Sequence, residues 1–271
     1  MLALVVRPPA FELELAADAL WSLGVLAVEE RTGPHGPELW TMLGDDPAVI
    51  AGRLDRWPPE WRWELVDIDA TVADTWRDFA VPTRITDELY VVPAWIDAEI
   101  EGGARCVRIE PGETFGLGDH PTTVLSARAM LDVLEPGSRL ADIGCGSGVL
   151  SVVGALCGAA TVDALDIHPA AVGTTLANAR RNGVAGRVRA GSWSLADLDG
   201  PYDVIVANIL APVLVGLAPQ MCRLVRPGGA IVISGILADR HDHVLGVFCG
   251  LEVEATLVLD GWAAVTLRDP G

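Results

Sequence analysis

Residues 138–148 read SRLADIGCGSG, an apolar run that ends at Asp142 and is followed by three alternating glycines, Gly144, Gly146 and Gly148. Glycine is needed where the backbone takes a positive φ, or where a ligand approaches too closely for a Cβ atom. The segment therefore predicts a buried strand that ends at a ligand-binding loop. A strand followed by a simple tight turn is the structural alternative.

The residues around this loop exclude one ligand class and disfavour another. A phosphate-binding P-loop places a lysine after its last glycine, whereas Val149 and Leu150 follow here, and all nineteen basic residues of the chain are arginine. Dinucleotide-binding loops have the spacing Gly-x-Gly-x-x-Gly, whereas this loop is Gly-x-Gly-x-Gly with Asp142 two residues ahead of it. A carboxylate there repels a pyrophosphate. It suits an ammonium group such as that of the methionine end of S-adenosylmethionine (SAM).

A second candidate ligand residue ends the next apolar run, TVDALDIHPAA (161–171), at Asp166. In doubly wound folds, an acidic residue that closes the second strand accepts hydrogen bonds from ribose hydroxyls. Both NAD and SAM carry a ribose, so Asp166 indicates a nucleoside without selecting one. Asp-x-His-Pro is also typical of a turn that caps a helix.

A third candidate is the helix start in ETFGLGDHPTTVLSARAMLDVL (113–134), where Asp119 or His120 can be the N-cap and Pro121 occupies the first turn. We expect the hydroxyls and N–H groups of Thr122 and Thr123 to be free. A helix start of this kind attracts carboxylates, so it can hold the carboxylate of the methionine moiety. A well-capped helix without a ligand is the alternative, and His120 alone indicates a structural role.

A fourth candidate, Asn208, ends the apolar run in YDVIVANILAPVL (202–214). A buried amide needs hydrogen-bond partners. Its side-chain oxygen, and the carbonyls of Asn208 and Ile209, can accept an N–H from a target nitrogen. An asparagine that only turns the chain into a helix is the alternative.

Residues 1–67 are predicted to be a separate module, because six of the nine tryptophans precede residue 80 and proline-rich breaks divide the segment into short units. The order of its units is β-α-β-β-α-β, which predicts a small ferredoxin-like α+β domain. We expect a linker helix over 68–79, followed by two strands in VVPAWIDAEI and CVRIEP. A module of this kind usually binds rather than catalyses.

The remainder of the chain, within a second domain over 80–271, alternates between strand and helix, which predicts a mostly parallel sheet covered on both faces. Asp260-Gly261 predicts a hairpin, so the last strand is expected to be antiparallel. That favours an α/β, Rossmann-like, seven-stranded methyltransferase domain over the NAD-binding fold. The expected elements are a helix at 121–134, strand 139–143, helix 148–157, strand 160–166, helix 170–182, strands 186–190 and 202–208, helix 210–225, strand 229–235, helix 238–248, and strands 251–259 and 262–268.

Composition limits the partners. A net charge of -18 argues against direct nucleic-acid binding and favours a basic partner. The five cysteines form no Cys-x-x-Cys pair, so we expect reduced core thiols, Cys145 among them, and no metal. No apolar run approaches the roughly 20 residues of a membrane span, and no cleavable leader is evident, so we expect a cytoplasmic protein with no membrane contact.

Together these segments resemble the PrmA family, the methyltransferases of the eleventh protein of the large ribosomal subunit. The resemblance covers nearly the whole chain. It is carried by DTWRDF, IEPGETFGLGDHPTT, DIGCGSGVLSV, LDIHP, ANARRNG, VANILA and PGGAIVISGIL. The run IEPG-x-x-FG-x-G-x-HPTT ahead of a glycine loop is the most specific of them.

The resemblance implies an N-terminal module that recognises the ribosomal protein, a linker, and a catalytic domain that binds SAM. It implies that Asn208 is catalytic and that the cofactor is bound by Thr123, Gly144, Asp166 and Asn208, with Asp142, Gly146, Phe115, Gly116 and His120 nearby. One residue departs from the family pattern, because Leu117 stands where the family usually has threonine. That removes one hydroxyl near the cofactor.

The implied reaction is N-methylation of lysine side chains or of an N-terminal amine, by a monomer that acts on a large-subunit ribosomal protein. An amine must be neutral to attack, so we expect closure over the target to lower its pKa. Three alternatives stay open. They are a methyltransferase with another protein or small-molecule acceptor, a non-catalytic SAM-binding ribosome-assembly module, which Leu117 favours, and an NAD-dependent oxidoreductase.

Overall fold

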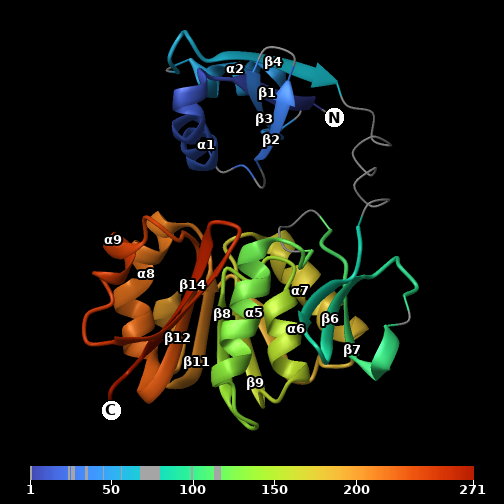
Figure 1. Ribbon diagram of the computed structural model, residues 1–271, viewed down its shortest axis with the longest axis vertical. Coiled ribbons are helices and arrows are strands. Elements are labelled where there is room, and N and C mark those ends of the chain that lie inside the picture. Colours follow the sequence, from blue (N-terminus) through green and yellow to red (C-terminus); the bar gives the residue numbers. More distant parts are fainter. Residues whose placement is uncertain are drawn as a thin grey trace. The chain divides into compact units, whose positions relative to one another are not determined.

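The computed structural model describes residues 2–23, 25, 28–33, 36–44, 46–55, 57–67, 80–98, 100–112 and 117–271. The chain divides into two compact units, Met1–Ala80 and Val81–Gly271, and each is described by itself (Figure 1). The predicted linker helix over 68–79 lies outside the described residues. In the part of the chain that is described, no helix is long and apolar enough to cross a membrane.

The N-terminal unit is a four-stranded antiparallel sheet with two helices. Its strands lie in the order β2-β3-β1-β4, and Leu4 and Val6 of β1 pack with Leu20 of α1 and Ile50 of α2 in one core. Asp46 caps α2 by accepting the N–H of Ala48 at 2.9 Å. In chain order the elements are β1 (Leu2–Arg7), α1 (Leu13–Ser22), β2 (Glu29–Gly33), β3 (Gly36–Thr41), α2 (Pro47–Leu54) and β4 (Arg62–Asp67).

The second unit is built on a mixed sheet with the strand order β10-β9-β8-β11-β12-β14-β13. Only β14 runs antiparallel to its neighbours, as the turn at Asp260-Gly261 predicts. A smaller sheet has the order β5-β6-β7. The elements are β5 (Thr83–Thr86), β6 (Leu89–Pro93), β7 (Arg105–Ile109), α5 (Pro121–Val133), β8 (Arg139–Ile143), α6 (Val149–Leu156), β9 (Thr161–Leu165), α7 (Pro169–Arg181), β10 (Val188–Gly191), β11 (Tyr202–Asn208), α8 (Ala211–Leu224), β12 (Val225–Leu237), α9 (Asp242–Leu245), β13 (Glu252–Leu259) and β14 (Trp262–Arg268).

Helices cover both faces of the large sheet (Figure 1). Alternate residues of each strand point to opposite faces. Leu140 of β8 packs with residues of α5 and α6 on one face, and its neighbour Ala141 packs with residues of α8 on the other. Asp142 therefore points to the α5 and α6 face.

Two predicted elements were wrong. The helix expected over 238–248 is reduced to α9, Asp242–Leu245, because β12 stays extended as far as Leu237, where it pairs with Trp262 of β14. The strand expected in VVPAWIDAEI ends at Pro93, after which the chain turns, and its ladder partner is β7. In both places, hydrogen bonds to another strand set the boundary of the element. The hydrophobic periodicity of the local sequence does not reveal such pairings.

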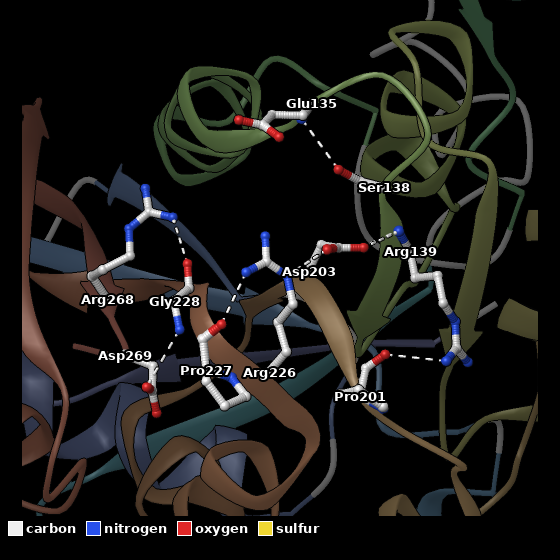
Figure 2. A network of polar contacts seen from close by, with 10 residues as sticks. All are labelled: Glu135, Ser138, Arg139, Pro201, Asp203, Arg226, Pro227, Gly228, Arg268 and Asp269. Atoms are coloured by element: carbon white, nitrogen blue, oxygen red, sulfur yellow. Dashed lines mark hydrogen bonds and ion pairs between the residues drawn. The ribbon is translucent and has the colours of Figure 1, made fainter. Parts of the chain in front are cut away.

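A polar network ties the strands together at the amino edge of the large sheet (Figure 2). The carboxylate of Asp203 in β11 accepts the N–H of Arg139 in β8 at 2.7 Å and the Nε–H of Arg226 in β12 at 2.6 Å. Arg268 of β14 donates to the carbonyl of Gly228 at 3.3 Å. Several of these residues line a cavity of about 190 Å³. Burial by itself raises the pKa of Asp203, but the Arg139 N–H and the Arg226 guanidinium outweigh it and lower that pKa.

Asp203→Ala is expected to reduce the free energy of unfolding by about 1–3 kcal/mol at neutral pH, because it leaves the Arg139 N–H without its acceptor. Urea unfolding measures this loss. A carboxyl whose pKa is lowered in the folded state contributes stability above its unfolded pKa, so the loss should shrink as the pH falls below about 4. Asp132→Ala, in the exposed wall of the same cavity, is the control and should change little. A loss that is independent of pH would contradict the electrostatic account.

Candidate functional site

Three neighbouring strands bring predicted site residues into one row at the carboxyl edge of the large sheet. Ile143 pairs with Leu165 and with Ala207, so the next residues, Gly144, Asp166 and Asn208, lie level with one another. Asn208 in turn pairs with Ser234 of β12. In parallel sheets, ligands bind at this edge.

The glycine loop packs against the segment that follows Asn208. Gly144, Gly146 and Gly148 have φ values of +75°, +52° and +78°, a region that favours glycine. A Cβ atom on Gly144 would overlap the Cγ2 atom of Ile209, and one on Gly235 would overlap the Ile209 carbonyl. Ile209 therefore lies between the two glycines, and this contact brings the residue after Asn208 against the loop. Sequence reasoning did not assign this role to Ile209.

Asp142 is fully buried and caps the helix that follows the loop. The N-cap of α6 is Gly148, which has no side chain, and Ser151 is the third residue of the helix. The Ser151 hydroxyl donates to Asp142 Oδ2 at 2.5 Å, and the Ser151 backbone N–H also bonds to this carboxylate. Ser151 was not singled out from the sequence, although its place three residues after the last glycine is where a capping partner is expected.

The other oxygen of Asp142, Oδ1, is buried and has no hydrogen-bond partner among the described residues. Burial raises the pKa of Asp142 to about 6, the bonds from Ser151 lower it, and the nearby Asp166 raises it. An unpartnered buried carboxylate oxygen is costly, so the arrangement fits a cationic ligand group on this side. An ammonium group is the cation that the sequence predicts here.

Both carboxylate oxygens of Asp166 accept hydrogen bonds from backbone N–H groups of the protein. Oδ2 accepts the N–H of Gly146 at 3.0 Å, and Oδ1 accepts the N–H of His168 at 2.9 Å, which is the capping turn considered from the sequence. Each carboxylate oxygen can accept more than one hydrogen bond, and the residue is only half-buried, so capping and ribose binding are compatible.

The start of α5 differs from expectation in one respect. The N–H groups of Thr122 and Thr123 are not free, since the first is accepted by His120 Nδ1 at 3.3 Å and the second by the His120 carbonyl at 2.9 Å. The Thr122 hydroxyl also lies 2.8 Å from His120 Nδ1. The prediction of a free helix start was wrong because the N-cap histidine is itself the acceptor. The buried Thr123 Oγ1 atom, in contrast, has no partner among the described residues.

His120 is the N-cap of α5, and its ring packs edge-to-face against Trp262 with ring centroids 5.3 Å apart. Burial lowers the pKa of His120, and the charge of Asp119 opposes that shift. A neutral imidazole can accept hydrogen bonds at the helix start, as His120 does. The structure thus gives His120 a structural role beside the site.

Asn208 ends β11 half-buried, and its side-chain amide forms no hydrogen bond within the described part of the chain. An amide of this kind is available to a ligand. Asn178 of α7 and Asn182, the C-cap of that helix, use their amides for the scaffold instead. They bond to the backbone of Glu110 and Arg108, and Asn178 also donates to the carbonyl of Ser147 in the glycine loop at 2.9 Å.

Four further residues were considered from the sequence in or near the site. Phe115 and Gly116 lie outside the described residues. Leu117 is half-buried. Cys145 is buried and accepts a hydrogen bond from Thr175 at 3.3 Å, and burial raises its pKa, so it is a packed thiol rather than a nucleophile.

This set of residues fits SAM. It offers an unpartnered carboxylate oxygen for an ammonium group, a half-buried carboxylate at the strand end for ribose hydroxyls, and an unpartnered threonine hydroxyl. Among the described residues of this set, there is no thiol with a lowered pKa and no nucleophile paired with a base. The arrangement is therefore suited to binding and orienting reactants rather than to covalent catalysis.

Gly144→Ala is expected to weaken binding of S-adenosylhomocysteine by at least about tenfold, because the new methyl group overlaps Ile209 at a positive φ. Isothermal titration calorimetry measures the affinity. Gly183→Ala is a matched control, since Gly183 also has a positive φ of +70° but has open space at its Cβ position. Equal losses in both variants would show that backbone strain, and not the contact with Ile209, is responsible.

The comparisons with known proteins agree with one another. The profile of the family described as "Ribosomal protein L11 methyltransferase (PrmA)" matches residues 57–270. A ribosomal protein L11 methyltransferase from Symbiobacterium thermophilum is 37% identical over 272 residues, covering 98% of this chain and 77% of that protein. One from Geobacter sp. (strain M21) is 39% identical over 252 residues, covering 90% and 77%. The crystal structure of ribosomal protein L11 methylase from Lactobacillus delbrueckii subsp. bulgaricus aligns with a TM-score of 0.66 at 28% identity, over 70% of this chain and 99% of that chain. This chain belongs to the ribosomal protein L11 methyltransferase (PrmA) family.

Proposed function

We propose that this protein transfers methyl groups from SAM to amino groups of ribosomal protein L11, on lysine side chains or on the N-terminal amine. The names of its relatives support the substrate, and family membership supports SAM as the methyl donor. The observation that carries the chemistry is the unpaired amide of Asn208, whose neighbour Ile209 lies against the glycine loop at Gly144. Family membership removes the NAD-dependent alternative.

The cofactor contacts follow from the groups that the fold leaves unsatisfied. We assign Asp142 to the ammonium group, Asp166 to the ribose hydroxyls, and the Gly144 loop to the close approach of the ligand. We assign the Thr123 hydroxyl, the remaining donor, to the methionine carboxylate. These assignments are supported by the orphaned Oδ1 and Oγ1 atoms and by the row of strand ends.

When bound, SAM supplies a methyl carbon that is activated by the adjacent sulfonium. The lone pair of the target nitrogen forms the new N–C bond while the C–S bond breaks, and the nitrogen then releases a proton to water. Asn208 is assigned to accept an N–H from the target amine and so to align its lone pair. A lysine titrates near pH 10.4 and an α-amino group near 7.7–8.0, so burial of the target must favour the neutral form, more so for lysine.

The N-terminal unit is assigned to substrate recognition. Its sheet order β2-β3-β1-β4, with both helices packed against one core, supports a ferredoxin-like domain over 1–67. We place a linker over 68–79 and the catalytic domain over 80–271. The net charge of -18 suits a basic ribosomal protein.

Exposed apolar side chains beside Asn208 support a polypeptide acceptor. Leu210 is 41% exposed and Val213 45% exposed in the segment that leads from β11 into α8, and Leu237 ends β12 at 37%. Exposed apolar groups gathered at a site mark a contact surface. We assign them to the aliphatic part of the target side chain and its neighbours.

Purified L11 incubated with the enzyme and SAM is expected to gain methyl groups, which intact-mass and peptide mass spectrometry locate. Asn208→Ala should lower kcat by about 100-fold or more and change the affinity for S-adenosylhomocysteine by less than about threefold, because the amide aligns the acceptor. Equal losses in turnover and cofactor affinity would contradict this role. Turnover only with another acceptor would reassign the substrate, and cofactor binding without turnover on any acceptor would make the chain a non-catalytic SAM-binding module.

Val213→Asp is expected to raise the KM for L11 by about tenfold and to leave the KM for SAM unchanged, since it places a charge on the apolar surface beside Asn208. Steady-state kinetics measure both constants. Val253→Asp is the matched control, because Val253 is 52% exposed at the beginning of β13, at the opposite edge of the same sheet. If both variants raise the KM for L11 equally, the apolar surface has no specific role.

A further inference from the structure

Ser151 lies on the first turn of α6 and is fully buried. Its hydroxyl donates to Asp142 Oδ2 at 2.5 Å. A serine in a helix commonly bonds to a carbonyl of the preceding turn, as Ser126 of α5 does when it donates to the Thr122 carbonyl at 2.7 Å. Ser151 instead bonds to the one carboxylate that precedes the glycine loop.

The two oxygens of Asp142 therefore have different roles. Oδ2 is held by Ser151, whereas Oδ1 is buried without a partner among the described residues. A carboxylate rotates about its last side-chain bond unless hydrogen bonds fix it. Without the Ser151 hydroxyl, either carboxylate oxygen of Asp142 could turn toward the start of α6. Neither oxygen would then be kept in place for a ligand.

We propose that Ser151 is a positioning residue of the cofactor site, whose hydroxyl holds Asp142 Oδ2 so that Oδ1 is left for the ammonium group of SAM. This inference rests on SAM as the cofactor in the proposed function. Ser151 itself does not touch the ligand in this arrangement.

The same hydrogen bond affects the charge of Asp142. Burial raises the pKa of this carboxyl to about 6, the bonds from Ser151 lower it, and Asp166, at the end of the neighbouring strand, raises it. The other titratable group near it is the Cys145 thiol, which burial keeps protonated. From the start of α5, the side chains near this edge are the neutral Thr122 and Thr123 and the N-cap His120, whose pKa burial lowers and the charge of Asp119 raises. Loss of the Ser151 donor should therefore raise the pKa of Asp142 further.

The charge of Asp142 makes cofactor affinity depend on pH. A ligand ammonium group binds the ionised carboxylate, so cofactor affinity is expected to fall as the pH falls through the pKa of Asp142 in the free protein. Ser151→Ala raises that pKa, so its affinity should begin to fall at a higher pH. A role in packing alone would weaken binding by the same factor at every pH.

The test is the affinity for S-adenosylhomocysteine of the full-length chain, measured by calorimetry from about pH 5 to about pH 7.5, below the range in which an α-amino group loses its proton. In Ser151→Ala, the midpoint of the fall should move upward by about one pH unit, which corresponds to the loss of one hydrogen bond to a charged group. Ser151→Cys, a weaker donor, should move the midpoint in the same direction by less.

Ser126→Ala is the matched control, because it removes an equally buried serine hydroxyl whose acceptor is a backbone carbonyl. Its midpoint should coincide with that of the wild type. Asp142→Asn should remove the pH-dependent fall. An unshifted midpoint in Ser151→Ala, or an equal shift in Ser126→Ala, would overturn the inference. These binding measurements do not depend on methylation of L11. If L11 is not the substrate, the methylation experiment fails while the binding results still test the role of Ser151.

Discussion

The hydrogen bonds from Ser151 to the buried carboxylate of Asp142 are the interaction on which the rest of the catalytic unit depends. The N-cap of α6 is Gly148, which has no side chain to cap the helix, so Asp142 at the end of β8 supplies the cap across the loop. A carboxylate at a helix N-terminus also gains from the helix dipole. The same carboxylate keeps its second oxygen buried and without a partner among the described residues.

The two edges of the large sheet satisfy their polar groups in opposite ways. At the amino edge, Asp203 is fully engaged by Arg139 and Arg226, and the network in Figure 2 ties the strands together. At the carboxyl edge, the side-chain amide of Asn208 and one oxygen of Asp142 have no protein partner within the described residues. A buried polar group without a partner is costly unless a ligand or solvent completes it, and this difference supports the carboxyl edge as the proposed ligand site.

Much of the scaffold follows from local sequence, and the deviations have a common cause. The glycine loop, the strand ends at Asp166 and Asn208, and the hairpin at Asp260-Gly261 are where their residue types predict them. The helix expected over 238–248 is replaced in part by the extension of β12, because pairing with β14 is decided by a strand that comes later in the chain. The N–H groups expected to be free at the start of α5 are engaged by His120, since its ring accepts the N–H of Thr122 and its carbonyl accepts that of Thr123.

The sequence by itself determined which residues end the strands and where the backbone needs glycine, because periodicity and positive φ are local properties. It also determined the family, since the motifs that carry the resemblance are contiguous. Only the tertiary structure decided which atoms of those residues remain available. Asp142 gives one oxygen to Ser151, Asp166 holds Gly146 and His168, and Ile209 lies between two glycines. These pairings depend on the register of neighbouring strands and the packing of α6, which join segments that no local pattern connects.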